Sequence, residues 1–367
     1  MADPRDKKVA ILGLGLMGGS LGLALTRGGF TVSGWDEKKE TVAEAYNIGA
    51  INRLPSSFQE AVSGVKFVFA ATPVGIIPGI IRQAIAWADP ETIFSDLGSI
   101  KESIIEQVFS FLPSDQYYVP GHPLTGSEQQ GLKGADPFLF QNAAYILVAE
   151  PRTPVSALER VTRLLQTTGA HLMTLTAAEH DRIVAMVSHL PHLLAATLAK
   201  TAGLAEEEHP GTLDLAAGGF RDTTRIAMGS PEVWEGILLG NGRRILEAIT
   251  SFQKQLDIVK QLIAGADKPG LTDYLGEARE VRSQIPAKNK GFLTLLYEMV
   301  VTIEDRPGAI EEVIRHLAKA GLNIKDIEIL RVREGEGGTL RLALENSLAV
   351  DQGVKVLEDK GFKVRRR

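Results

Sequence analysis

The chain has 367 residues, of which 44% are hydrophobic and 23% charged, with a net charge of -5 and no cysteine. This length predicts two or three globular domains, and the absence of cysteine excludes disulfides, thiolate metal sites and thiol nucleophiles. The acidic balance without a basic stripe argues against nucleic acid as a partner, and no uncharged apolar run is long enough to indicate a membrane span. The polar start of the chain lacks a signal peptide and predicts a cytoplasmic location.

Short β-rich runs alternate with helical stretches over residues 7–175. This alternation is typical of an α/β domain with a parallel, doubly wound sheet of the Rossmann type. The expected strands are Val9–Leu12, Thr31–Gly34, Lys66–Ala70, Thr92–Ser95, Tyr145–Val148 and His171–Thr174.

The first strand leads into a glycine-rich turn that fits the binding of a dinucleotide. Gly13 allows a tight turn, Gly15 allows the backbone to approach a pyrophosphate, and Gly18 allows a helix to pack closely on the strand. The first helical turn, which contains Leu16 and Met17, directs its free N–H groups toward the phosphates. We therefore expect a dinucleotide site at this turn.

Two further features of this domain concern the choice of cofactor. Asp36 follows the second strand, where its carboxylate can accept hydrogen bonds from both ribose hydroxyls and would repel a 2′-phosphate. The sequence therefore predicts NAD in preference to NADP, although Asp36 could instead serve only to close the turn. Thr72 and Pro73 fall in the expected fourth-strand loop, where they either border the nicotinamide ribose or simply end the strand.

His122 is the best candidate for a catalytic base, in a turn bounded by proline and glycine within Pro120–Glu128. An imidazole titrates near neutrality and can take a proton from a substrate hydroxyl while a bound nicotinamide takes the hydride; a purely structural hydrogen bond is the alternative. Ser99 follows a strand at the carboxyl edge of the sheet, where such folds bind ligands. It either contacts the same substrate or caps a helix over residues 100–111.

Residues 176–285 are predicted to form an all-helical domain, because β-branched runs become rare and amphipathic stretches follow. Thr176 and Glu179 fit a capping box at its start. The stretch 183–202 is apolar on most sides, so we expect it to be buried either in the domain centre or against a second subunit.

Two polar clusters lie in this helical region. Arg221, Asp222 and Arg225 follow a glycine pair and indicate an anion site, in which the aspartate would hold a guanidinium that binds a carboxylate. An ordinary ion pair on a helix is the alternative. His189 and His192 are three positions apart without a third ligand, so helix packing or substrate contact is expected in place of a metal site.

The polar stretch 286–292 is predicted to be a linker to a third domain, residues 293–367. The elements expected after it follow the order βαββαβ, which is typical of a ferredoxin-like domain. They are strands at 293–303, 323–332, 339–344 and 362–364, with helices at 307–320 and 350–360.

Five motifs between residues 8 and 283 together resemble the prephenate/arogenate dehydrogenase family of tyrosine biosynthesis. They are the glycine turn with Asp36, DLGSIK at 96–101, GHPLTGSE at 121–128, SHLPH at 188–192, and GGFRDTTR at 218–225 followed by PEVW at 231–234. In the last segment, EDRPG at 304–308 and GLNI at 321–324 resemble an ACT domain, a regulatory module that binds amino acids.

The resemblance implies that His122 accepts a hydrogen bond from the ring hydroxyl of the substrate, that Ser99 orients the same oxygen, and that Arg225 binds a carboxylate. It also implies that paired helical domains complete each site, so we expect a homodimer. Further implied roles are pocket lining by His192 and Trp234, an ionic gate with Glu128 and Asp222, a second anion contact at Arg221, and effector binding by Asp305, Gly308, Asn323 and Ile324.

The implied activity is the NAD-dependent oxidative decarboxylation of prephenate to 4-hydroxyphenylpyruvate, with tyrosine as the expected effector. Removal of a hydride and a proton at the ring alcohol permits loss of CO₂ and aromatisation, which requires neither a metal nor a covalent nucleophile. Three alternatives remain: an arogenate dehydrogenase, which shares every motif; a β-hydroxyacid dehydrogenase, which leaves the Gly-His-Pro segment unexplained; and a non-catalytic sensor of NAD and amino acids.

Overall fold

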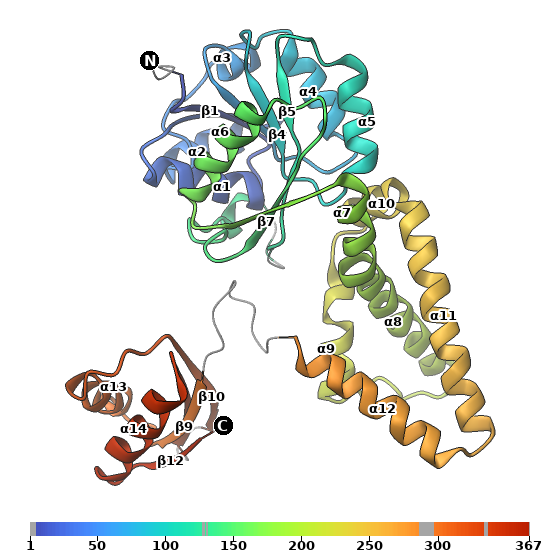
Figure 1. The fold of residues 1–367 in the computed structure, drawn as a ribbon, viewed down its shortest axis with the longest axis vertical. Coiled ribbons are helices and arrows are strands. Elements are labelled where there is room, and N and C mark those ends of the chain that lie inside the picture. The colour runs from blue at the N-terminus through green and yellow to red at the C-terminus, as the bar shows by residue number, and fades with distance from the viewer. Residues whose placement is uncertain (1–4, 127–128, 130, 286–296, 334–336, 367) are drawn as a thin grey trace. The chain divides into compact units, whose positions relative to one another are not determined.

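The computed structural model describes residues 5–126, 129, 131–285, 297–333 and 337–366. The chain divides into two compact units, residues 1–291 and 292–367. The first unit contains two sheets with helices around them and then a set of helices, and the second contains a single sheet with two helices (Figure 1).

A five-stranded parallel sheet forms the first part of the first unit. Its strand order is β2-β1-β3-β4-β5, and an isolated parallel bridge between Ser33 and Arg53 marks the place of one more strand beyond β2. With that bridge counted, β3 is the fourth strand of the doubly wound order, and the direction in which strands are added to the sheet reverses between the parallel neighbours β1 and β3. The strands are β1 (Lys8–Leu12), β2 (Thr31–Trp35), β3 (Phe67–Ala70), β4 (Ile93–Asp96) and β5 (Tyr117–Val119).

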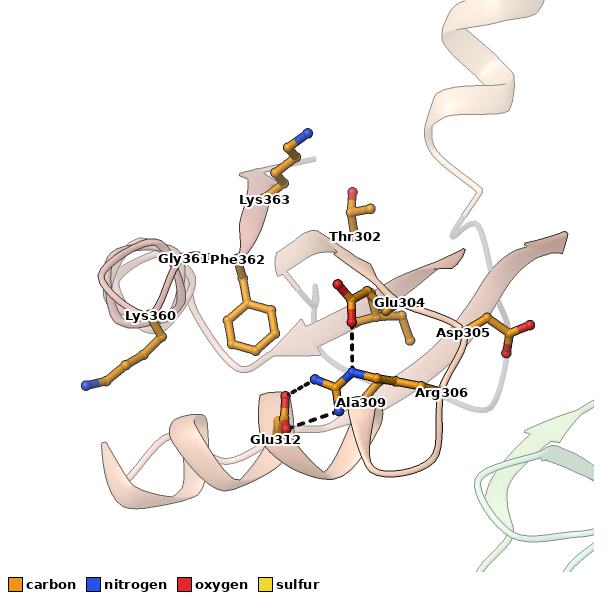
Figure 2. A pocket seen from close by; sticks show the side chains of 11 residues that line it. Thr302, Glu304, Asp305, Arg306, Ala309, Glu312, Lys360, Gly361, Phe362 and Lys363 are labelled. Carbon is orange, nitrogen blue, oxygen red and sulfur yellow. Dashed lines mark hydrogen bonds and ion pairs between the residues drawn. The ribbon is translucent and has the colours of Figure 1, made fainter. Parts of the chain in front are cut away.

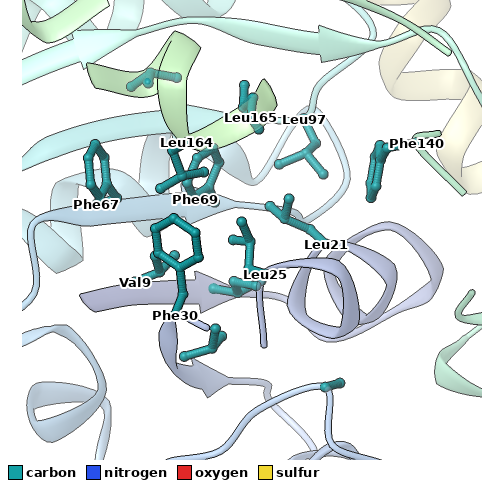
Figure 3. Close-up of a cluster of buried hydrophobic side chains, with 14 of the residues drawn as sticks. Val9, Leu21, Leu25, Phe30, Phe67, Phe69, Leu97, Phe140, Leu164 and Leu165 are labelled. Atoms are coloured by element: carbon teal, nitrogen blue, oxygen red, sulfur yellow. The ribbon is translucent and has the colours of Figure 1, made fainter. Parts of the chain in front are cut away.

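Both faces of this sheet are buried under helices. Successive residues of each central strand point to opposite sides, so neighbouring residues belong to two different cores. Val9 packs with Leu21 and Leu25 in one core, which also contains Leu164 (Figure 3), whereas Ala10 belongs to the core on the other face. The surrounding helices are α1 (Leu16–Arg27), α2 (Lys39–Asn47), α3 (Phe58–Val62), α4 (Ile77–Ile85), α5 (Glu102–Phe111) and α6 (Val155–Gln166).

The last two expected strands do not join the parallel sheet. They are β7 (Ala144–Val148) and β8 (His171–Leu175), and they form a separate mixed sheet in the order β6-β7-β8. The expectation of one parallel sheet is therefore wrong for this part, and two short strands, β5 and β6 (Gly121–Pro123), were not predicted. Pro120 lies between them, and because proline lacks an N–H it cannot continue the ladder beside β4.

The rest of the first unit is helical, as predicted, and its capping box is confirmed. Thr176 accepts a hydrogen bond from the Glu179 N–H, and the Glu179 carboxylate accepts one from the Thr176 N–H. A π-helical turn, Ala185–His189, joins the first two helices into one run. The helices are α7 (Ala177–Val184), α8 (Leu190–Glu208), α9 (Gly218–Thr224), α10 (Pro231–Gly240), α11 (Gly242–Ala264) and α12 (Lys268–Ser283), with short 3₁₀ turns at Leu132–Gly134 and Arg225–Met228.

The run Ala177–Glu208 is, within the described residues, the helix that is long and apolar enough by length and composition to cross a membrane. Only 33% of its most apolar window is buried inside the chain. Of the two places expected for the stretch 183–202, the domain centre is therefore wrong for a single chain, because Met186 (46% exposed), Val187 (65%) and Leu198 (40%) reach the surface, and burial against a second subunit stays a prediction.

The second unit follows the expected order βαββαβ, with an antiparallel sheet in the strand order β10-β11-β9-β12. Its second helix begins earlier than predicted because the Asn346 side chain accepts a hydrogen bond from the Ala349 N–H at 2.8 Å and so caps it. The predicted linker 286–292 and residues 334–336 lie outside the described residues. The elements are β9 (Tyr297–Ile303), α13 (Ala309–Lys319), β10 (Asp326–Arg333), β11 (Gly337–Leu344), α14 (Ser347–Glu358) and β12 (Lys363–Arg366).

Candidate active site

The glycine turn after β1 has the geometry that a dinucleotide requires. Gly13 adopts φ +96, and a Cβ there would lie 2.8 Å from the carbonyl oxygen of Ala71. A Cβ on Gly18 would lie 1.9 Å from the Gly13 oxygen, whereas a Cβ on Gly15 would meet nothing within 4 Å. Two glycines therefore permit close packing, and the third leaves open space in front of the turn.

The N-terminus of α1 faces this open space, and no side chain of the described residues caps it. Gly15 is the N-cap and provides no side-chain hydrogen bond, and no acidic residue lies in the first turn, which begins with the half-buried Leu16 and Met17. The free N–H groups and the positive end of the helix dipole thus remain available to a pyrophosphate. These residues fit a bound dinucleotide.

Asp36 lies directly beside this turn, at the end of β2. One carboxylate oxygen accepts the Leu14 N–H at 2.9 Å, and the other accepts the Lys38 N–H at 3.1 Å. Asp36 therefore closes the turn as one interpretation expected, and the same contacts fix its half-buried carboxylate where a ribose would lie. In the loop after β3, the Thr72 hydroxyl is buried without a partner among the described residues, and Pro73 is exposed.

His122 lies on β6, not in the expected turn. It pairs with Ile146 of β7 in an antiparallel register, and only 9% of the residue is exposed. Its Nδ1 lies 2.7 Å from Nε2 of His180 on α7, so a hydrogen bond joins the small sheet to the first helix of the helical region.

His180 continues this contact to a carboxylate. Its Nδ1 lies 2.7 Å from Oδ1 of Asp181, which is also buried. Because a carboxylate only accepts, His180 carries its proton on Nδ1 and accepts the Nδ1–H of His122 at its own Nε2. Among the described residues no partner is found for His122 Nε2, which is left as an acceptor, the atom that a general base uses.

Asp181 also fixes the start of α5. Its two carboxylate oxygens accept the backbone N–H groups of Lys101 and Glu102 at 2.7 and 2.8 Å. The helix begins at Glu102, so the predicted helix start at residue 100 and the capping role considered for Ser99 are both wrong. Ser99 is half-buried in the loop between β4 and α5, and a distant aspartate performs the capping.

A buried ion pair supports the backbone next to His122. The Lys101 ammonium bonds to the Asp96 carboxylate and donates to the carbonyl oxygen of Gly121 at 2.7 Å. The Tyr118 hydroxyl donates to the other Asp96 oxygen at 2.5 Å. Because all of these groups are buried and mutually satisfied, they restrict how far β6 can move relative to the loop after β4.

The electrostatics favour a neutral imidazole at position 122. Burial, together with the nearby charges of His180 and Lys101, lowers the pKa of His122 well below its usual 6.5. Burial also lowers the pKa of His180, although the hydrogen bond that His180 donates to Asp181 acts in the opposite direction. His122 is therefore ready to accept a proton at neutral pH.

The predicted substrate residues of the helical region are only partly brought together. His192 of α8 stacks on Trp234 of α10, with ring centroids 3.5 Å apart and planes at 10°. Arg221 and Asp222 on α9 and Arg225 beyond it are exposed in the single chain, so the arginines are not buried. Glu128 lies outside the described residues. No group of three or more metal-ligating side chains occurs in the part of the chain that the structure describes.

The second unit carries two cavities beside its β9–α13 loop. A cavity of about 650 Å³ is lined by Asp305 and by Arg306, whose guanidinium bridges Glu304 and Glu312 (Figure 2). A second cavity of about 640 Å³ is lined by Gly308, which adopts φ +88 at the start of α13. The described lining of neither cavity contains Asn323 or Ile324.

Comparison with known proteins agrees with this geometry. The nucleotide-binding domain model of prephenate dehydrogenase matches residues 21–174, and the corresponding dimerization domain model matches residues 176–277. A prephenate dehydrogenase of Bacillus subtilis is 34% identical over 341 residues, which cover 92% of each chain. The chain belongs to the prephenate dehydrogenase family.

Relatives within the prephenate dehydrogenase family include solved structures. A prephenate dehydrogenase from A. aeolicus, solved with hydroxyphenyl propionate and NAD+, is 29% identical with a TM-score of 0.72; the match covers 76% of this chain and 98% of that one. An arogenate dehydrogenase from Synechocystis is also 29% identical, with a TM-score of 0.67 and coverage of 76% and 99%. About a quarter of this chain therefore has no counterpart in either structure.

The sequence analysis did not predict a role for His180 and Asp181, which form the hydrogen-bonded series that begins at His122. Both lie on the buried face of α7, at the helical spacing of the buried Val184. A histidine and an aspartate on the apolar face of an amphipathic helix were therefore the available signal. Lys101 and Asp96 belong to the DLGSIK motif at 96–101, but the sequence did not predict that their side chains form a buried ion pair.

Proposed function

We propose that the chain catalyses the NAD-dependent oxidative decarboxylation of prephenate to 4-hydroxyphenylpyruvate. The observation that carries this proposal is the buried His122, whose Nδ1 is engaged by His180 and whose Nε2 is left as a free acceptor. A neutral base of this kind is what the removal of a hydroxyl proton requires.

The glycine turn and Asp36 would hold the cofactor, with its pyrophosphate at the N-terminus of α1 and its adenosine ribose at the carboxylate. Bound NAD supplies the hydride acceptor. Thr72 and Pro73 follow β3, the strand next to β1 where the sheet order reverses, and would border the nicotinamide ribose.

His122 and Ser99 would act on the ring hydroxyl of the substrate. His122 Nε2 takes the hydroxyl proton as the carbonyl develops, and it returns this proton to the phenolate oxygen once the C–C bond to the ring carboxylate has broken and CO₂ has left. The electrons of that bond enter the ring, so the reaction has no net proton change. His180 and Asp181 act as positioning residues that stabilise the protonated imidazole between these two events.

The helical region would hold the other end of the substrate. Arg225 would bind the side-chain carboxylate, with Arg221 as a second anion contact, while Asp222 and Glu128 would form an ionic gate. The stacked His192 and Trp234 would line the pocket. A pocket of stacked rings beside cations suits a ring that bears carboxylates.

A homodimer would cover the apolar surface that a single chain exposes. Val187 on the π-helical turn, Leu239 on α10 and Leu246 on α11 are 65%, 77% and 65% exposed. The matched family model for this region is a dimerization domain, which supports the same interpretation. Apolar side chains exposed over three neighbouring helices are typical of a subunit interface.

The experiment is an assay of the full chain with prephenate and NAD. We expect NADH absorbance to rise and 4-hydroxyphenylpyruvate to accumulate in a one-to-one ratio with NADH. Arogenate is tested in parallel, because the Synechocystis structure is of an arogenate dehydrogenase. Preferred turnover of arogenate would assign that activity instead, and binding of NAD without turnover of either substrate would support a sensor.

We further propose that the second unit is an ACT domain that inhibits the enzyme when it binds tyrosine. Its βαββαβ order is ferredoxin-like, and the cavities beside Asp305 and Gly308 are large enough for an amino acid. A cyclohexadienyl dehydrogenase of Zymomonas mobilis aligns over 95% of its own length with only 75% of this chain, which supports the presence of an added unit.

Removal of residues 286–367 tests this regulatory role. The shortened chain should retain most of its turnover of prephenate and lose its inhibition by tyrosine. As a matched control, Asp305→Asn in the full chain should weaken inhibition without changing uninhibited turnover. Unaltered inhibition of the shortened chain would place the effector in the active site.

A further inference from the structure

His189 is a buried histidine that has no role in the mechanism proposed above. It is the last residue of the π-helical turn Ala185–His189, and only 1% of the residue is exposed. Its ring meets the edge of Trp234, with centroids 6.1 Å apart and planes at 85°. A π-helical turn inside a longer helix is frequent at functional sites, because it reorients one side chain.

The hydrogen bonds of Asn241 determine which nitrogen of His189 carries the proton. Asn241 Nδ2 donates to the backbone carbonyl of Asp181 at 2.8 Å, and the same Nδ2 lies 3.3 Å from His189 Nδ1. A carbonyl only accepts, so this atom of Asn241 is the amide nitrogen, and its second hydrogen points to Nδ1. His189 Nδ1 is therefore an acceptor and Nε2 carries the hydrogen.

The Nε2–H of His189 is a buried donor without a partner among the described residues. Buried polar groups are nearly always hydrogen-bonded, and leaving one unpaired costs stability. Burial also lowers the pKa of His189 to about 4, so the ring is neutral at pH 7. The described part of the chain thus holds a neutral donor without an acceptor.

Asp181 connects this donor to the catalytic base. Its carboxylate contacts His180 and thereby His122, and its backbone carbonyl holds Asn241, which orients His189. Besides burial, His189 also lowers the pKa of His122, which places the two rings near one another, and a ligand oxygen at Nε2 would satisfy the donor.

We propose that His189 Nε2–H binds the ring carboxylate of the substrate, the group that leaves as CO₂; this inference rests on the proposed function. A cation at this place would stabilise the carboxylate before reaction and so oppose its loss, because only interactions that persist in the transition state accelerate a reaction. A neutral imidazole donor orients the carboxylate without this penalty. His189 is therefore a substrate-binding residue that is distinct from the carboxylate anchor Arg225.

Two substitutions at His189 separate this role from a structural one. His189→Leu and His189→Gln both remove the Nδ1 acceptor of Asn241, but glutamine places an amide N–H near the former Nε2 position. The KM for prephenate is measured with each variant. The Kd of 4-hydroxyphenylpyruvate, which lacks the ring carboxylate, is measured by calorimetry. Thermal unfolding of both variants shows that they are folded.

We expect His189→Leu to raise the KM for prephenate roughly 10- to 100-fold, as for a lost hydrogen bond to a charged group, and to leave the Kd of 4-hydroxyphenylpyruvate unchanged. His189→Gln should restore most of the KM. Equal losses for both ligands, equal effects of both substitutions, or an unaltered KM would each overturn the proposal. Failure of the unmodified chain to turn over prephenate would instead overturn the proposed function itself.

Discussion

The imidazoles of His122 and His180 are joined at 2.7 Å between Nδ1 and Nε2, although 58 positions separate them in the chain. The first lies on a three-residue strand and the second on the first helix of the helical region. This contact fixes the tautomer of His122, and with it the direction in which a proton can move.

His122→Asn should abolish most turnover while leaving the KM for prephenate within a few-fold of its original value. Removal of a general base lowers kcat by about 10²- to 10⁴-fold. Steady-state kinetics with prephenate and NAD measure the effect, and the exposed His209→Asn serves as the matched control. Turnover that survives in His122→Asn would assign the proton transfer to another group.

Asp181→Asn should lower kcat on the order of 10²- to 10⁴-fold, because the amide no longer stabilises a positive charge on the paired imidazoles. One oxygen remains to cap α5, so the free energy of unfolding should fall by only about 1 kcal/mol. Kinetics and urea unfolding are compared with the exposed Asp214→Asn. If Asp181→Asn lowers the free energy of unfolding but retains full turnover, Asp181 serves only to cap α5.

The pH dependence of kcat/KM should show an acid limb below pH 6.5, since burial lowers the pKa of His122 well below that value. The base works in its neutral form, so activity is complete above its lowered pKa and is lost as the pH falls through it. A profile of log kcat/KM from pH 4.5 to 9 gives the position of this limb. A midpoint above pH 6.5 would mean that a different group controls the reaction.

Asp36→Asn should raise the KM for NAD about tenfold and narrow the preference for NAD over NADP. The carboxylate charge is lost, while one oxygen remains to accept the Leu14 N–H that now bonds at 2.9 Å, so the turn is kept; hydrogen bonds to charged groups contribute about 1.5–3 kcal/mol. The neighbouring, exposed Glu37→Gln removes the same charge outside the turn. If both variants bind NAD equally well, Asp36 only closes the turn.

Local patterns predicted the elements that depend on neighbouring residues. The strand before the glycine turn, the capping box at Thr176 and the βαββαβ order were all readable, because spacing and turn chemistry act over a few positions. The strand at His122 was not, because Gly121–Pro123 has three residues, two of which are poor strand formers. Only its pairing with β7 makes it a strand.

Site residues could be predicted where a short motif contains the reactive side chain, but not where the site forms from residues that are distant in the sequence. His122 was found from its segment, but its partners His180 and Asp181 are identified only by packing of α7 against α5 and β6. The N-cap of α5 shows the same limit: Ser99 stands at a plausible position in the sequence, yet Asp181, 80 positions from Lys101, supplies the carboxylate. The helical pattern can place His180 and Asp181 on a buried face of α7, but it does not indicate which distant residues they contact.

Arg225→Ala should raise the KM for prephenate roughly 30- to 1000-fold, because a charge-assisted contact with a carboxylate is lost. This factor corresponds to about 2–4 kcal/mol of binding free energy. Arg225 is exposed in the single chain, so its removal should leave the thermal unfolding temperature nearly unchanged. Arg221→Ala, one helical turn away, removes an equal charge and should raise the KM much less. Equal increases would show that the whole cationic surface attracts the substrate, and an unaltered KM in Arg225→Ala would assign the carboxylate anchor to a different residue.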